Sequence, residues 1–386
     1  MKRRAKGTGT IYRRKDGRWA GEIDVTLSNG EQKRALTTSK SREVVRSWLR
    51  KIRDQENRKI PYSEKDWTVA EYLDYWMQDV QVGRIRETTM EAYNLTIKKH
   101  LKPTLGSHKL QNLRACDIRH ALDMLEKRGC LGATIQKSLW ILSACLNCAL
   151  REEVIQRNVA QLVEKPKYNP KETRIWTVEQ AALFLHSVKD HPHFIAFLLL
   201  LTYGMRRGEV LGLRWSDIDF ENELIHVRQQ IGRINGKIIP RNLKTANSLR
   251  TLPLMTNVRE ALMNHAKKCN VTPSQFVPYI ELSTQNTVIV SKSGTPLEPR
   301  NLGRLFDVLT KKVGLPRIKV HAMRHTAATV LKDLNVPIKD AQLILGHANI
   351  LTTMKIYQHG TPEAHRTAIS AVEDRLLGRH VMLVNI

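Results

Sequence analysis

The first 58 residues alternate between apolar and polar positions, with turn sequences between the alternating runs. A period of two sets one face of a strand against a core, so the pattern predicts strands over residues 10–13, 19–27 and 31–37. Asp16-Gly17 and Asn29-Gly30, which separate these runs, are residue pairs that tight hairpin turns favour. We therefore expect a small antiparallel sheet of three strands.

A stripe of apolar residues at helical spacing follows the third strand, and it consists of Val44, Val45, Trp48, Leu49 and Ile52. One such stripe covers one face of a three-stranded sheet and leaves the other face open. We expect the open face to be rich in Arg and Lys, with Arg13, Arg14 and Arg18 as candidate DNA contacts. A basic face that only aids solubility is the alternative. Sheet and helix together predict a domain over residues 1–58.

Periodicity changes to that of helices after a charged linker at about residues 54–66. Thr68 and Glu71 form a capping box that begins a helix, and a second box, Thr88 to Glu91, predicts a helix that runs through His100. Residues 103–106, with a proline and a glycine, are expected to break that helix. Residues 116–127 and 134–152 predict two more helices. The pattern indicates a compact, all-α four-helix domain over residues 67–153.

The pattern becomes mixed after a second linker, residues 164–172, which is rich in proline and lysine. Helices are predicted over residues 177–187, 193–202, 206–213 and 258–267, and from residues 299, 320, 338 and 362. Strands are predicted over residues 224–229, 237–239, 249–254 and 287–290. This pattern favours a mainly helical α+β domain with a small antiparallel sheet over residues 172–376, followed by a tail over residues 377–386.

Composition restricts the partners of this chain. Its 386 residues carry a net charge of +26 with a pI near 10.0, which favours a polyanion: nucleic acid, an anionic membrane surface or an acidic partner. A membrane is the weaker choice, because the longest apolar run, residues 194–201, is far shorter than the roughly 20 residues of a spanning helix. No apolar region follows the basic N-terminus, so we expect a soluble protein in the cytoplasm.

The five cysteines are scattered, and reduced thiols are the expectation for such a chain. Cys145 and Cys148 form a C-x-x-C pair, but no second pair follows at zinc-ligand spacing and the surrounding sequence is that of a buried helix. His321 and His325 lie four apart, yet Ala322 stands where a zinc protease of the H-E-x-x-H type needs a glutamate. We expect no metal and no cofactor.

Candidate chemistry lies in the last predicted domain. His321 and Arg324 are three apart and can share a helix face, and the Arg fork suits a phosphate. A Gly-His pair that contains His347 follows, and then Tyr357, which can be a nucleophile. Each of these residues taken alone is most often a solvated or core side chain. The case for a catalytic site therefore depends on further motifs upstream.

Two upstream motifs supply such groups. In GMRRGE, Glu209 lies three residues after Arg206. Its carboxylate can accept hydrogen bonds from the Arg206 guanidinium and so fix the orientation of that group. In LKTANSLRTLPL, Lys244 lies in a predicted turn between strands and can act as a mobile proton donor. Phosphoryl transfer through a tyrosine needs groups of these types: arginines for the charge, a histidine as base and a lysine as acid. No acidic cluster of the two-metal kind is evident.

The motifs GMRRGE, LKTANSLRTLPL, HAMRHTAAT and LGHANILTTMKIYQH, in this order over residues 172–376, resemble those of a tyrosine recombinase of the phage and conjugative-transposon integrase family. Residues 67–153 are similar to the core-site-binding domain of that family, and the first sixty residues resemble the arm-site-binding domain of its longer members. The resemblance implies a bacterial enzyme, associated with the nucleoid, that recombines double-stranded DNA. It further implies a homotetramer that acts through a Holliday junction, without ATP, usually with a small excisionase or DNA-bending helper.

The resemblance also implies a role for each site residue. Tyr357 would attack the scissile phosphate and form a 3′-phosphotyrosyl link, while Arg206 and Arg324 would clamp the phosphate. Lys244 would act as general acid. His321 would be a base or phosphate contact, and His347 would hydrogen-bond the phosphate. A role for His359, two residues after the tyrosine, stays open.

Three other functions remain as alternatives. A type IB topoisomerase shares the phosphotyrosine chemistry but needs neither an arm-binding module nor a tetramer. A cellular recombinase that resolves chromosome dimers usually lacks the first basic domain. A non-enzymatic DNA-binding protein would use the same basic domains with an inactive catalytic site. All the expected catalytic residues are present in this chain, which disfavours that alternative.

Overall fold

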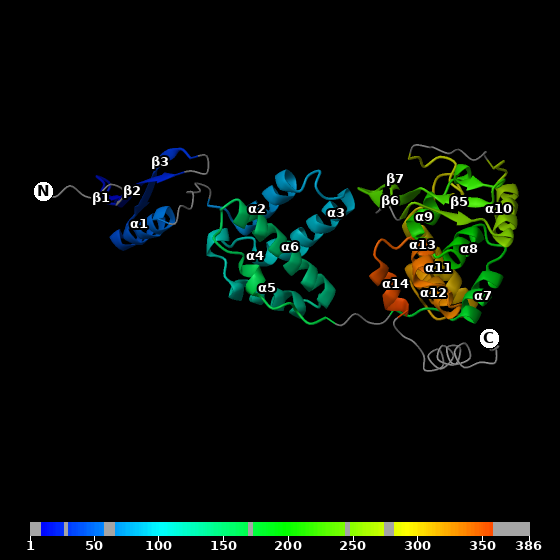
Figure 1. Ribbon diagram of the computed structural model, residues 1–386. Coiled ribbons are helices and arrows are strands. Elements are labelled where there is room, and N and C mark those ends of the chain that lie inside the picture. The colour runs from blue at the N-terminus through cyan, green and yellow to red at the C-terminus, as the bar shows by residue number, and fades with distance from the viewer. Residues whose placement is uncertain are drawn as a thin grey trace, which may run out of the picture. The chain divides into compact units, whose positions relative to one another are not determined.

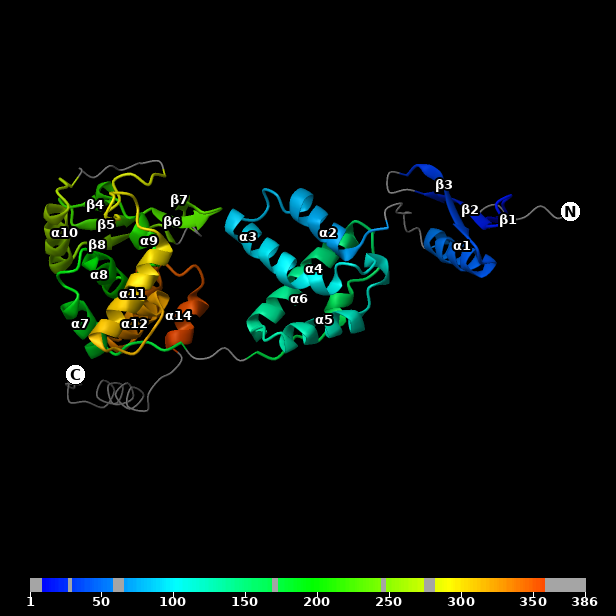
Figure 2. The ribbon, with the colours of Figure 1, turned by 180° about the vertical axis from the view of Figure 1, so that it is seen from behind.

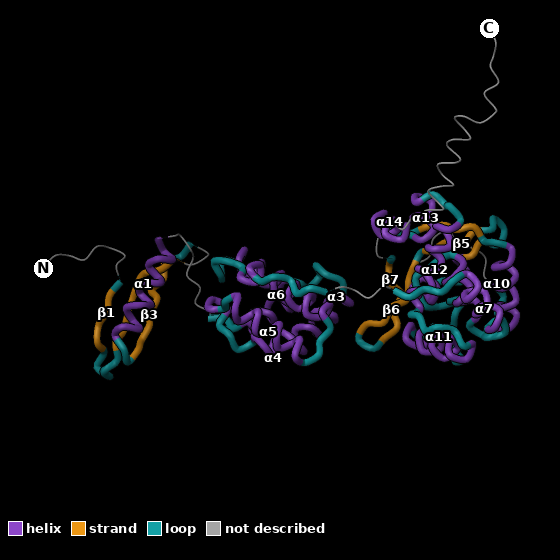
Figure 3. The backbone as a smooth tube through the Cα atoms, turned by 90° about the horizontal axis from the view of Figure 1, so that it is seen from below, coloured by secondary structure: helices purple, strands orange, loops and turns teal. Residues whose placement is uncertain are grey.

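The computed structural model describes residues 9–26, 30–57, 66–168, 173–243, 248–273 and 282–357. The chain divides into two compact units, Met1–Pro170 and Lys171–Ile386, and each is described by itself (Figure 1). The tube drawing in Figure 3 shows the difference in content: sheet and then helices in the first unit, helices mixed with strands in the second. No helix within the described ranges has both the length and the apolar character needed to cross a lipid bilayer.

The N-terminal sheet has the predicted three strands, β1 (Thr10–Arg13), β2 (Trp19–Thr26) and β3 (Gln32–Ser39), antiparallel in the order β1-β2-β3. Helix α1 (Arg42–Asn57) packs on one face. The small core that they share consists of Ile23, Val25, Ala35, Val45, Leu49 and Ile52. Val44 was predicted to join this core but is 56% exposed, because it lies outside the stripe that faces the sheet.

The prediction for the open face of this sheet is wrong. Residues paired across antiparallel strands share a face, and the register pairs Glu22 with Leu36 and Asp24 with Arg34 on the side away from α1. In the described strands Arg34 is the only Lys or Arg on that side, and its Nε lies 3.0 Å from Asp24 Oδ1. Arg13, Arg14 and Arg18 lie instead, exposed, around the β1–β2 turn.

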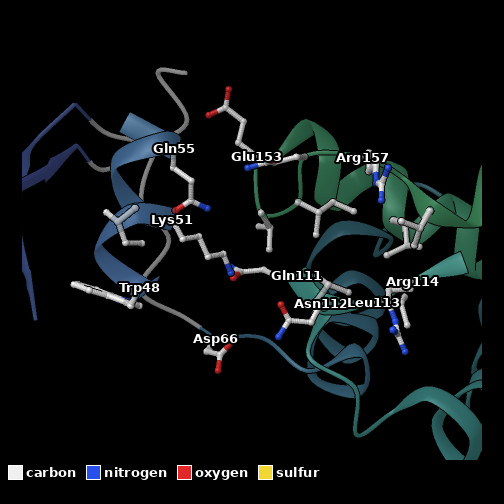
Figure 4. A pocket seen from close by; sticks show the side chains of 17 residues that line it. Trp48, Lys51, Gln55, Asp66, Gln111, Asn112, Leu113, Arg114, Glu153 and Arg157 are labelled. Carbon is white, nitrogen blue, oxygen red and sulfur yellow. The ribbon is translucent and has the colours of Figure 1, made fainter. Parts of the chain in front are cut away.

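The second part of the first unit is helical. Its main helices are α2 (Val69–Tyr75), α3 (Glu87–Thr96), α4 (Lys102–Leu105), α5 (Ala115–Lys127) and α6 (Gly132–Arg151). The predicted capping box of Thr68 and Glu71 is present at the start of α2. The core includes Ile155 and Val163, so it extends beyond residue 153. Figure 4 shows Gln111, Asn112, Leu113 and Arg114 on the segment that leads into α5.

Two local predictions in this helical part are wrong. Thr88 lies inside α3, which begins at Glu87 with Arg86 as its N-cap, so Thr88 and Glu91 form no capping box at its start. Pro103 does not break the helix. The turn before it, Ile97–Leu101, is a π-helix, and the Lys102 N–H donates to the Ile97 carbonyl five residues back. This wider turn lets the chain continue helically through a residue that lacks an N–H.

The second unit combines helices with two small antiparallel sheets. The helices are α7 (Val178–Ser187), α8 (Phe194–Thr202), α9 (Arg207–Gly212), α10 (Thr256–Lys268), α11 (Pro299–Val313), α12 (Val320–Asp333), α13 (Ile338–Leu345) and α14 (Ile350–Tyr357). Strands β4 (Ile218–Asp219), β5 (Leu224–Val227) and β8 (Arg250–Pro253) form one sheet, and β6 (Gln229–Ile234) and β7 (Lys237–Asn242) the other. The predicted α+β class is confirmed.

Helix α12 lies at the centre of the part of this unit that holds the candidate site. It packs against α8, α13 and α14, and both ribbon views show α14 beside it (Figures 1 and 2). Residues 287–290 were predicted as a strand but make only isolated bridges, Arg214 to Thr287 and Val290 to Pro296. Strand β6 and helix α14 were not predicted. The predicted turn at Lys244 and the predicted helix from Pro362 lie outside the described residues.

Candidate active site

Arg206 and Glu209 make the predicted contact at the start of α9. Arg206 is the N-cap residue. The Glu209 carboxylate accepts a hydrogen bond from the backbone N–H of Arg206 at 2.9 Å and another from Arg206 Nη1 at 2.6 Å. Burial favours the neutral form of Glu209, but the charges of Arg250 and Arg206 outweigh it and hold its pKa below the usual value. Glu209 is therefore a buried anion that orients the guanidinium of Arg206.

Arg206 also ties distant segments together. Its Nη2 donates to the Gly346 carbonyl at 2.7 Å, and its Nη1 lies 3.4 Å from Ser248 Oγ. Gly346 ends α13 in the left-handed region, with φ of 66°, and a Cβ there would lie 2.8 Å from Arg250 Nη1. Only glycine fits without strain at this point of close approach. The guanidinium of Arg206 thus joins α9, the start of β8 and the end of α13.

Arg324 is the second predicted arginine, and it is 3% exposed on α12. Its Nη1 donates to the Gly204 carbonyl at 2.7 Å, whereas its Nη2 is buried and has no partner among the described residues. Burial, and then the charge of Arg206, lowers the pKa of Arg324 to about 9. A buried donor without an acceptor, beside a second cation, is the arrangement that a bound anion satisfies.

His321 and His325 lie four apart on α12 with their ring centroids 5.3 Å apart. Desolvation of its ring, followed by the charges of His325 and Arg324, lowers the pKa of His321 to about 4. The residue is exposed, so solvent screens part of this effect. The direction of the shift favours a neutral ring at neutral pH, which is the form that accepts a proton.

His347 follows Gly346 directly and is buried. Its Nδ1 lies 2.8 Å from Thr353 Oγ1, and its carbonyl accepts from Gln342 Nε2 at 2.9 Å, so side chain and backbone are both held. Burial, then the charges of Arg324 and Arg206, lowers the pKa of His347 to about 4. The lowered pKa favours a neutral ring at neutral pH, and the role of His347 at a phosphate stays a prediction.

Tyr357 is the last described residue and ends α14. Its hydroxyl donates to the Val336 carbonyl at 3.0 Å, in the turn between α12 and α13. Partial burial raises the pKa of this hydroxyl. The oxygen is therefore held by a backbone acceptor, and an attack on a phosphate requires this hydrogen bond to break.

The remaining predicted residues have different outcomes. Lys244 lies outside the described residues, between β7 and β8. Arg13, Arg14 and Arg18 belong to the first unit. Cys145 and Cys148 are buried in α6. Within the described ranges, no group of three or more His, Cys, Asp or Glu side chains is arranged to hold a metal ion.

Sequence analysis overlooked one residue of the site, Arg250. It lies within LKTANSLRTLPL, and its Nη2 donates to Glu209 Oε2 at 2.9 Å. The alternation of β8 was the available signal, since an arginine next to apolar positions of a short strand can point inward. Its partners, 41 and 94 residues away in the chain, could not be identified from local spacing.

Families and relatives with known names match this chain in sequence. Residues 157–364 match the phage integrase family, and residues 68–125 match the N-terminal SAM-like domain of phage integrases. A tyrosine recombinase XerC-like protein of Caldanaerobacter subterraneus subsp. tengcongensis is 26% identical over 93% of this chain and 97% of its own length. The integrase of Mycobacterium phage L5 is 23% identical over 96% of this chain and 98% of its own length.

A solved structure is also similar to this chain. The integrase of transposon Tn1549, in complex with a circular intermediate DNA, has a TM-score of 0.68 and 25% identity. The match covers 79% of this chain and 99% of that one.

Proposed function

Because the chain belongs to the phage integrase family and is a tyrosine recombinase that cuts and rejoins DNA, we propose that Tyr357 is its nucleophile and that Arg206 and Arg324 hold the scissile phosphate. The enzyme is a site-specific integrase of a mobile element, for integration and excision. The observation that carries the residue assignment is the buried Nη2 of Arg324, which has no hydrogen-bond partner among the described residues and is close enough to Arg206 to feel its charge.

The chemistry follows from these groups. The Tyr357 oxygen attacks the phosphorus, a 3′-phosphotyrosyl bond forms, and the bond to the 5′ oxygen breaks. Negative charge that spreads over the non-bridging oxygens is met by the two guanidinium groups, which are already oriented by Glu209 and the Gly204 carbonyl. The phosphodiester energy is kept in the protein link, so attack by a 5′ hydroxyl of another strand reseals the DNA without ATP.

Proton transfers complete each step. His321, with its lowered pKa, is suited to accept the tyrosine proton or to contact the phosphate. We assign the protonation of the leaving 5′ oxygen to Lys244, which comes between β7 and β8 in the sequence, and a hydrogen bond to the phosphate to His347. The ring of His347 is held through Nδ1 by Thr353, which leaves Nε2 as the nitrogen for this bond.

The wider organisation is proposed from the same family membership. Residues 1–58 bind arm-type sites, residues 67–153 bind core-type sites, residues 172–376 catalyse, and residues 377–386 form a tail. Four protomers act on two double-stranded DNA sites through a Holliday junction, in the bacterial cytoplasm on the nucleoid. A small excisionase or DNA-bending helper sets the direction.

A denaturing assay tests the nucleophile. Wild-type protein on a nicked attachment-site substrate is expected to form a protein–DNA adduct that survives denaturant, and Tyr357→Phe is expected to form none. Tyr203→Phe is the matched control, because it removes another hydroxyl that donates to a carbonyl, that of Pro253 at 2.8 Å, and should keep the adduct. An adduct with Tyr357→Phe would contradict the assignment.

A cellular recombinase that resolves chromosome dimers is the second candidate, since the relative named XerC-like matches over 97% of its length. The described N-terminal sheet favours a mobile element, because arm-type sites need a second DNA-binding domain. Binding to separate arm-type sequences distinguishes the two functions.

A further inference from the structure

Arg250 is the first residue of β8, and its side chain is 6% exposed. Its three donor nitrogens reach three different segments. Nη2 donates to Glu209 Oε2 at 2.9 Å, Nε to the Ile344 carbonyl at 2.8 Å, and Nη1 to the Ser248 carbonyl at 3.2 Å. A planar guanidinium can hold three acceptors in fixed directions at once.

Each of these acceptors lies next to a group that contacts Arg206. Glu209 binds the Arg206 guanidinium directly, and the hydroxyl of Ser248 lies 3.4 Å from Arg206 Nη1. Ile344 comes two residues before Gly346, whose carbonyl accepts from Arg206 Nη2. Arg250 therefore shares Glu209 and Ser248 with Arg206, and it bonds the backbone two residues before Gly346.

We propose that Arg250 is a positioning residue for DNA cleavage, which sets Arg206, the end of α13 with His347, and Ser248 before β8 in one geometry. The inference rests on the proposed function, because it assigns Arg250 a task in that site. Arg250 touches neither the phosphate nor the tyrosine in this scheme. It acts through Glu209, Ser248 and the carbonyl of Ile344.

Packing at Gly346 supports this role. A Cβ on Gly346 would come within 2.8 Å of Arg250 Nη1, so the end of α13 lies directly against the guanidinium. A shorter or differently shaped side chain at residue 250 would leave this surface of α13 without support. Gly346 and His347 would then be free to shift relative to Arg206.

Charge gives a second reason. Glu209 is fully buried, and Arg250 and Arg206 are the cations bonded to it. Without Arg250, the carboxylate would keep Arg206 as its only ion-pair partner among the described residues and would draw that guanidinium away from an incoming phosphate. Because Glu209 is shared by two arginines, Arg206 keeps N–H groups that can donate hydrogen bonds to a ligand.

Arg250→Lys is the central variant, because lysine keeps the charge but cannot hold three acceptors in fixed directions. We expect unchanged DNA affinity in a gel-shift assay and a protein that stays folded at the assay temperature, with a melting temperature lowered by the lost hydrogen bonds. The single-turnover rate of Tyr357 adduct formation at saturating protein should fall about a hundredfold, the scale of a misplaced catalytic group. Methylguanidinium should restore part of the rate to Arg250→Ala and none to Arg206→Lys.

Arg259→Met is the matched control. Arg259 pairs with Glu223 at 3.6 Å on the surface of the same unit, so its loss should change neither rate nor affinity. A wild-type rate in Arg250→Lys would overturn the inference, and so would unfolding of that variant, which would show a purely structural role. If the wild-type protein forms no adduct that depends on Tyr357, the proposed function fails instead.

Discussion

Two pairs of arginine and carboxylate, one in each unit, have nearly the same geometry and very different surroundings. Arg34 Nε lies 3.0 Å from Asp24 Oδ1 on the N-terminal sheet, with side chains 68% and 59% exposed. Arg250 Nη2 lies 2.9 Å from Glu209 Oε2 in the second unit, with side chains 6% and 0% exposed. Distance alone therefore says little about what each pair does.

The difference in burial separates two uses of positive charge. Exposed pairs are screened by water and salt, and their cations remain available to attract DNA over a distance. Buried pairs exclude water and fix directions, because leaving either partner alone would be costly. The first unit is expected to use its charge for affinity, and the second to use it for orientation.

Deletion of residues 1–60 tests this division most strongly. Binding to arm-type sequences should fall to the non-specific level, on the order of a thousandfold, while cleavage at the core site is retained. Gel-shift titrations on separate arm-type and core-type fragments measure the two effects. Unchanged binding to arm-type fragments would show that the first domain is not an arm-site reader.

Arg206→Ala tests the orienting role with the next largest effect. DNA binding should be retained, because only one cation among many is lost. The rate of adduct formation should fall at least about a hundredfold, because an oriented hydrogen-bond donor to the phosphate is missing. A matched change on the sheet, Arg34→Ala, should leave the cleavage rate as it is. Equal losses of binding and cleavage in Arg206→Ala would remove the distinction between the two regions.

Gly346→Ala examines the same geometry without altering any charge. A methyl group would press against Arg250 and strain a residue at φ of 66°, so the end of α13 should shift. We expect adduct formation to slow by about tenfold. Gly314→Ala is the control, since Gly314 also ends a helix at positive φ but has nothing within 4 Å of a Cβ.

Asp24→Asn should have the smallest effect. An exposed pair contributes little to the free energy of unfolding, and this contribution falls as salt is added. Chemical denaturation of the isolated N-terminal segment at low and high salt measures it. A large loss of stability that is insensitive to salt would mean that burial does not explain the contrast with Glu209.

Local patterns were sufficient for much of the fold. The three strands of the first domain, the cap of Thr68 and Glu71 at α2, and the contact of Arg206 with Glu209 all involve residues within one turn or one hairpin. The predictions that failed depended on backbone geometry or strand register that local patterns did not supply. Pro103 is accommodated by a π-turn, and the two acids of β2 occupy the face expected to be basic.

The sequence by itself determined most of the elements and most of the residue types in the candidate site, because spacing along one helix or strand decides which side chains share a face. Tertiary structure alone decided that Arg206 meets Gly346, 140 residues away, and that Arg250 joins Glu209 to Ile344. It also decided that Arg324 has a buried nitrogen without a hydrogen-bond partner among the described residues. Burial and the directions of these hydrogen bonds arise only when distant elements pack together, so they cannot be predicted from the periodicity of the sequence.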